Sequence, residues 1–158
     1  MEKENFNLKE EYDKFAKKYK LPEFEIIDED LELSLSIEKQ KFLLKNIRRR
    51  LHDKLAFFAR ILEGVIYPNT SSLVAMQEAK YFTDNEKSEM SKIYKKIVSI
   101  ERASNVLDIE SSEKEESSFI IATYKEFKSI KKEIKSITEK MVNSWNKEDM
   151  PESEGYFG

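Results

Sequence analysis

The fold of this chain is decided by residues 44–65, which read LKNIRRRLHDKLAFFARILEGV. Apolar residues recur there in steps of three and four, the spacing of one face of an α-helix. The spacing predicts a long amphipathic helix over 37–66, and the break at 67–70, which contains Pro68, predicts its end. The apolar positions are Leu44, Ile47, Leu51, Leu55, Phe58, Leu62 and Val65.

Similar patterns on either side predict four more helices. One starts after Asn7 and is stopped by Pro22, and a shorter one covers 71–82. A Thr-x-x-Glu capping box at Thr83 and Glu86 predicts the start of a helix that ends near 108. The last helix is predicted from about 112 to 145. Its apolar stripe follows a heptad pattern at Thr123, Phe127, Ile130, Ile134, Ile137 and Met141.

Residues 22–37 show a different period. Leu31, Leu33 and Leu35 alternate with polar residues, as in a half-buried β-strand. No second strand is predicted to pair with it, so we expect an extended strap over the helices or a lone strand that pairs with another chain. The predicted fold is therefore all-α: a helical bundle of four to five helices, with an extended strap near the N-terminus and a mobile C-terminal tail.

The composition limits the domain organisation and the chemistry. A length of 158 residues with few Gly and Pro predicts a single helical domain over 1–147, followed by an acidic tail over 148–158. The absence of cysteine indicates a cytoplasmic protein without thiol chemistry, and the longest apolar run, residues 55–59, is too short to span a membrane. The chain has one histidine and no glycine-rich phosphate loop, so we expect no catalytic residue, no cofactor and no enzyme activity.

Three features favour binding to another protein. The strand-like segment, the heptad pattern and the two aromatic residues at the end of the acidic tail each offer apolar surface to a partner. We therefore expect a non-catalytic protein-interaction subunit or adaptor, which could also self-associate through its last helix. The candidate partner-binding residues are Ile134, Ile137, Met141, Tyr156 and Phe157.

Nucleic-acid binding is the main alternative. The net charge of −3 gives the whole chain no attraction for phosphate, so binding would be weak and would need a local basic patch. Two such patches are predicted on helix faces, one in the quoted helix and one in the last helix. Their residues are Arg48, Arg49, Arg50, Lys125, Lys128, Lys132 and Lys135.

Two short resemblances point toward DNA-associated proteins. The arginine-bearing segment 47–51, the pair Phe57 and Phe58, the pair Leu62 and Glu63, and residues 86–97 look like the helical domain of GINS replication-scaffold subunits. The small β-domain of that family has no counterpart in this sequence. The tail resembles the acidic motifs, ending in an aromatic residue, that some single-stranded-DNA-binding proteins offer to partners, although Gly158 departs from that pattern.

A metal site is the third alternative. The pairs Glu86 and Glu89, and Glu113 and Glu116, have a spacing that all-helical magnesium-dependent nucleotide hydrolases use to hold metal. Both pairs also lie in the predicted first turn of a helix, where acidic residues oppose the positive end of the helix dipole. The dipole explanation is favoured, and no metal-ligating residue is predicted.

Overall fold

The computed structural model describes residues 6–38 and 41–147, and helices account for most of them. The predicted all-α class is confirmed. The described residues contain seven helices, however, rather than four to five. They are α1 (Leu8–Tyr19), α2 (Phe24–Leu31), α3 (Leu33–Ser36), α4 (Leu43–Ile66), α5 (Leu73–Lys80), α6 (Asp84–Ile109) and α7 (Glu113–Asn146).

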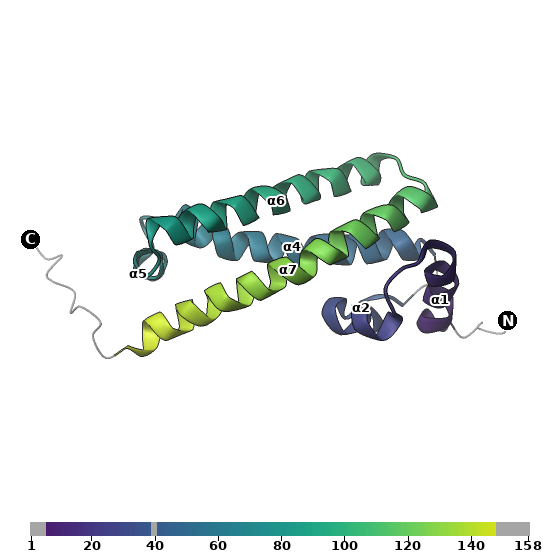
Figure 1. The fold of residues 1–158 in the computed structure, drawn as a ribbon, viewed down its shortest axis with the longest axis horizontal. Coiled ribbons are helices and arrows are strands. Elements are labelled where there is room, and N and C mark those ends of the chain that lie inside the picture. Colours follow the sequence, from purple (N-terminus) through teal and green to yellow (C-terminus); the bar gives the residue numbers. More distant parts are fainter. Residues whose placement is uncertain (1–5, 39–40, 148–158) are drawn as a thin grey trace, which may run out of the picture.

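Three long helices, α4, α6 and α7, form the body of the molecule (Figure 1). Near its start α4 meets the first turn of α7, where Arg48 bonds Glu116, and further along Phe58 stacks on Phe127 at 5.6 Å between ring centroids. The helices α4 and α7 therefore run in the same direction. Helix α6, which lies between them in the sequence, runs in the opposite direction. The apolar stripe predicted for α4 is buried along this bundle, with Phe58 and Leu44 at its margins.

Hydrogen-bonded caps set the starts of the two later helices. The Thr83 hydroxyl accepts from the Glu86 amide and the Glu86 carboxylate accepts from the Thr83 amide, which confirms the predicted capping box of α6. Ser112 and Glu115 form the same reciprocal pair at the start of α7. Each pair satisfies two amides that the helix itself leaves without a partner.

The prediction of an extended strap or lone strand over 22–37 is wrong, because this segment forms α2 and α3 and the described residues contain no strand. In α2, Phe24, Ile27 and Leu31 lie on one buried face at helical spacing. Glu32 then adopts a left-handed conformation with φ of 55° and ends the helix. This turn lets Leu31 and Leu33 both enter the core, which produces an alternating pattern without a strand.

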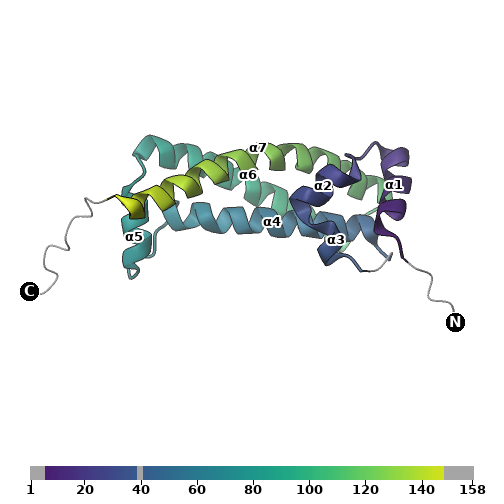
Figure 2. The same ribbon diagram turned by 90° about the horizontal axis from the view of Figure 1, so that it is seen from below.

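The small helices divide the bundle into two ends. We call the end next to α1, α2 and α3 the α1 end, and the end next to α5 the α5 end (Figure 2). Tyr12 of α1 is fully buried there, and its hydroxyl donates to the carbonyl of Pro22. Across the described residues, no helix combines the length and the apolar character needed to cross a membrane.

Candidate binding surfaces

The first predicted basic patch contains a buried ion cluster. Arg48 is fully buried, and its Nε donates to Glu116 at 2.6 Å while its Nη2 donates to Asp108 at 2.7 Å. Its Nη1 donates to both the carbonyl and the hydroxyl of Ser104. Ser111 donates to the second oxygen of Glu116 at 2.7 Å. The cluster joins α4 to the end of α6 and the start of α7, so Arg48 has no surface to offer to a phosphate.

The contact between Arg48 and Asp108 also shifts the pKa of Asp108. The hydrogen bond from Arg48 is the main cause that lowers the pKa of Asp108 from its ordinary value of 3.8. Burial opposes this shift, and the positive charge of Arg48 adds to it. The paired carboxylate is favoured in its charged form because its partner is a fixed cation. Among the described residues, every buried side-chain nitrogen or oxygen atom has a hydrogen-bond partner, as expected for a stable buried ion cluster.

The other two arginines differ in exposure. The Nε of Arg50 donates to the Leu31 carbonyl at 2.8 Å and its Nη2 donates to Glu32 at 2.9 Å, so Arg50 holds the α2–α3 junction against α4. Arg49 is about half exposed and pairs with Asp108 at 3.2 Å. The adjacent arginines therefore do not form one surface patch.

The second predicted basic patch does lie on the surface. Lys125, Lys128, Lys132 and Lys135 are all exposed on α7. Lys128 lies over the Tyr124 ring, and Lys135 has a distant contact with Glu139 at 3.9 Å. Lys125 and Lys132 make no ion pair with any described residue.

The two carboxylate pairs of the metal alternative lie in the first turns of α6 and α7, and these helices begin at opposite ends of the bundle (Figure 1). At the α5 end, Glu86 pairs with Lys140 at 2.6 Å and Glu89 with Lys92 at 2.7 Å. At the α1 end, Glu113 accepts from Lys18 and Tyr19, and Glu116 belongs to the buried ion cluster. Each of these carboxylates thus has a hydrogen-bond donor within the protein. In 6–38 and 41–147, no group of three or more histidine or acidic side chains is placed to hold a metal ion.

The predicted partner-binding residues of α7 pack within the chain. Ile134 is buried, and Ile137 and Met141 are partly buried against the same core. The heptad pattern therefore marks the contact of α7 with its own bundle. The other two candidates, Tyr156 and Phe157, lie outside the described residues.

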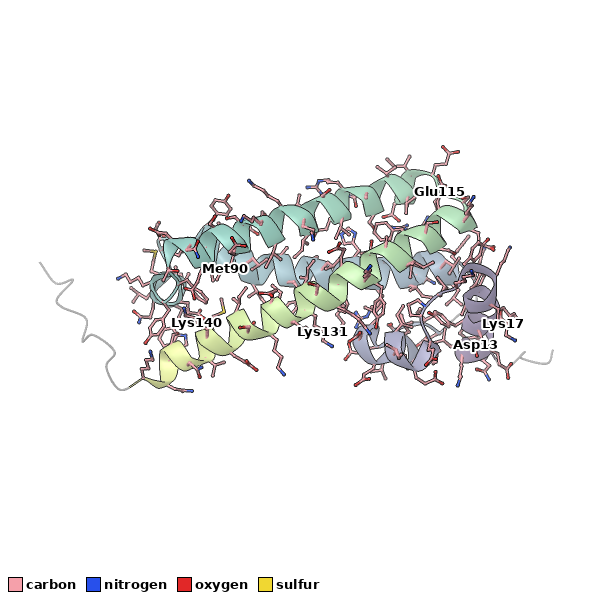
Figure 3. All side chains as sticks on the ribbon, viewed as in Figure 1. Asp13, Lys17, Met90, Glu115, Lys131 and Lys140 are labelled. Carbon is pink, nitrogen blue, oxygen red and sulfur yellow. The ribbon has the colours of Figure 1, made fainter. Side chains whose placement is uncertain are left out.

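A different surface is defined by the position of α2 on the bundle. Lys131 of α7 donates to Asp30 at 2.6 Å, and the Tyr124 hydroxyl also donates to Asp30. On α4, Lys54 donates to Glu32 at 2.8 Å, next to the Arg50 contact. These contacts place α2 and its junction with α3 over the same side of α4 and α7, and Figure 3 shows Lys131 on the α2 side of α7.

The same side of both helices continues past α2 toward the α5 end. At about 100° per residue, Phe57 and Ile61 follow Arg50 and Lys54 along one stripe of α4. On α7, the positions that follow Lys131 on its stripe are Lys135, Thr138, Val142 and Trp145. Figure 2 shows α2 and α3 over the α1 half of this side and no helix over its α5 half. We call Phe57, Ile61, Thr138, Val142 and Trp145 the α4–α7 face. Because Phe58 stacks on Phe127, Phe57 lies near the α2 part of this face, whereas Val142 lies about four helical turns further along α7, roughly 22 Å away and beyond the end of α4.

Apolar side chains are exposed on the α4–α7 face. Phe57 is 50% exposed, Val142 55% and Trp145 38%. The heptad pattern does not identify them, because Val142 directly follows the core residue Met141 and Phe57 directly precedes the core residue Phe58. The sequence signal that could have found them is a large apolar residue just outside a core stripe.

Comparison with known protein families, characterised proteins and solved structures finds no match to this chain.

Proposed function

We propose that this chain is a non-catalytic helical protein-interaction subunit or adaptor that binds a partner protein through the α4–α7 face. The observation that carries this proposal is the exposure of Val142 and Trp145 near the end of α7, with Phe57 exposed on the same side nearer to α2. The lack of cysteine in the sequence supports a cytoplasmic location for this binding.

The composition of the face suits a partner contact. Aromatic residues are enriched in the cores of protein interfaces, and the face offers Trp145 within one helical turn of Val142 on α7, and Phe57 on α4. Complete burial of one large apolar side chain contributes roughly 1.5–3 kcal/mol, and these side chains are about half buried before any partner binds.

A matched pair of variants tests this function. Val142 lies on the face, whereas Val106 of α6 is 62% exposed and lies near the α1 end. We expect Val142→Glu to lose the partners that copurify with the wild type from nuclease-treated extract of the native host, and Val106→Glu to keep them. Circular dichroism should show the same helicity for both variants.

Two results would contradict the proposal. Equal recovery of partners by Val142→Glu and the wild type would show that partners do not bind at the face. Loss of every partner on nuclease treatment of the wild type would indicate bridging by nucleic acid instead.

A DNA- or RNA-associated factor, such as a GINS-like replication scaffold, is the second candidate. It is favoured by Lys125 and Lys132, which are exposed without an ion pair and lie two helical turns apart, about 10 Å, on α7. We expect micromolar, sequence-independent binding that weakens steeply with salt, measured by fluorescence anisotropy. Reversing the charge of the four α7 lysines should weaken it more than Arg49→Glu, and no binding at low salt would reject this candidate.

A further inference from the structure

We infer that the outer sides of α6 and α7 together bind the phosphate backbones of a double-stranded nucleic acid. This inference goes beyond the proposed partner function and does not depend on it. It also extends the second candidate function, because it adds residues of α6 to the lysines of α7 and names the form of the nucleic acid.

An ion pair shows which sides of α6 and α7 face each other. Lys96 of α6 lies 2.8 Å from Glu126 of α7. The next residue in each helix, Ile97 or Phe127, is fully buried. Successive residues of a helix are turned by about 100°, and α6 and α7 run in opposite directions (Figure 1). Both turns therefore lead to the same side of the α6–α7 pair, which is the side of the core.

The residue before the ion pair lies on the opposite, outer side in each helix, by the same geometry. These two residues are Lys95 and Lys125, and both are exposed. They lie at the same level of the bundle, because each precedes one member of the same ion pair. The outer sides of α6 and α7 thus form one surface, on which Lys95 and Lys125 are neighbours.

Positive charge recurs two helical turns further along each helix. Arg102 follows Lys95, and Lys132 follows Lys125, by about 10 Å. The helices are antiparallel, so these two steps lead in opposite directions and the cations span roughly 20 Å. We call Lys95, Arg102, Lys125, Lys128 and Lys132 the outer basic face. All are exposed, and none makes an ion pair with a described residue.

The acidic residues of the same stretches lie off this face. Glu126 points toward α6 and is paired with Lys96, and Glu133 follows it by two turns on the same side of α7. Glu101 of α6 is turned by about 120° from Lys95. The outer basic face therefore keeps its positive charge, although the whole chain carries a net charge of −3.

The shape of the face favours a duplex. Its cations form one row on each helix, and the axes of neighbouring helices lie roughly 10 Å apart. This separation is close to the width of a duplex groove, about 6–12 Å, so each row can meet the phosphates of one strand. Sites for single strands add exposed aromatic rings on which bases stack. The ring beneath Lys128 belongs to Tyr124, which is buried.

A fluorescently labelled DNA duplex of about 20 base pairs is the probe, and anisotropy with the full chain measures its binding. We expect a micromolar Kd at about 50 mM salt. The logarithm of Kd should rise with that of the salt concentration with a slope of about 4, because each neutralised phosphate contributes about 0.9. A slope below about 2 would mean that the two helices do not act together, and would overturn the inference.

Charge reversals test whether both helices contribute. Lys95→Glu and Lys125→Glu should each weaken duplex binding about fivefold or more and lower the salt slope by about 1. Arg60→Glu on α4 is the matched control, because Arg60 is also exposed without an ion pair to a described residue, and it should leave Kd within about twofold. Circular dichroism should show the same helicity for all of them.

Other results would overturn the inference. An effect of Lys125→Glu without one of Lys95→Glu would confine binding to α7, and an equal effect of Arg60→Glu would leave only the net charge. Tighter binding of the single strand would reject the duplex. Binding to vesicles of phosphatidylcholine and phosphatidylserine, without binding to the duplex, would assign the face to a membrane surface. Absence of duplex binding at low salt would reject the inference, while the recovery of protein partners by Val142→Glu still tests the proposed function.

Discussion

The two ends of the bundle differ in where their ion pairs lie. At the α1 end, Arg48 and Glu116 are buried together and three short helices cover the long ones. At the α5 end, Lys140 and Glu86 pair at the surface, and Val142 and Trp145 remain exposed. Figure 3 shows Lys140 on the side of α7 toward α5, while Lys131 lies on the α2 side.

This difference determines how firmly each end fixes the packing of the long helices. A buried ion cluster tolerates few alternative arrangements, because any shift of α6 or α7 leaves a charge without its partner. Surface ion pairs such as Lys140–Glu86 contribute little and constrain little. The α1 end thus fixes how the three long helices align, whereas both ends expose apolar side chains.

The largest effect is expected for Arg48→Met. This change leaves the Glu116 carboxylate buried without its cation, which costs about 3–5 kcal/mol in the free energy of unfolding, measured with urea. Arg49→Met is the matched control and should cost about 0.5 kcal/mol or less, because Arg49 is half exposed. Adding Glu116→Leu to Arg48→Met should recover part of the loss. Equal costs for the two single variants would show that the ion cluster does not hold the α1 end.

A smaller effect is expected from the titration of Asp108. Its pKa is lowered in the folded state, so its contribution to stability is complete above the ordinary value of 3.8 and is lost as the pH falls through the lower folded-state value. Asp108→Asn should cost about 1 kcal/mol or less at neutral pH, since solvent screens this partly exposed group. The stability of the variant, measured by thermal unfolding, should then fall less than that of the wild type between pH 5 and 2. Parallel curves would contradict this assignment.

The smallest effect is expected at the α5 end, for Gly64→Ala. A Cβ at Gly64 would meet no heavy atom within 4 Å, and Gly64 lies in the last turns of α4. The change should stabilise the fold by about 0.5 kcal/mol, because alanine has the higher helix propensity. Thermal unfolding would measure it. A loss of stability would show that the α5 end is packed more tightly than its exposed residues indicate.

Much of the fold could be predicted from the sequence, because the long helices bury stripes with a clear helical period. The period in α4 and the capping box at Thr83 are local features that need no tertiary information. The helical α2–α3 segment could not be predicted, since the left-handed turn at Glu32 depends on the burial of Leu31 and Leu33 on either side. Tertiary packing overrides the local pattern there.

The candidate surfaces were harder to predict than the fold. Arg48 and Arg49 are neighbours of the same type, and only the partner helices decide that one is buried and the other exposed. The sequence did contain one signal for a buried polar contact, a polar residue in an apolar stripe. Ser104 follows the core residue Ile97 by seven positions on α6. The α4–α7 face depends on where α2 ends over two other helices, which no single stretch of sequence contains.

The buried ion cluster also has a consequence for folding kinetics. Arg48 is separated by 56 residues from Ser104 and by 68 from Glu116, whereas α6 and α7 are neighbours in sequence. Both α6 and α7 pack mainly on α4 and little on each other, so the cluster closes only when all three long helices have come together, and the guanidinium loses its hydration at that late step. Contacts made this late are largely absent from the transition state of folding, so they slow unfolding more than they speed folding. The cluster is thus expected to lengthen the lifetime of the folded protein.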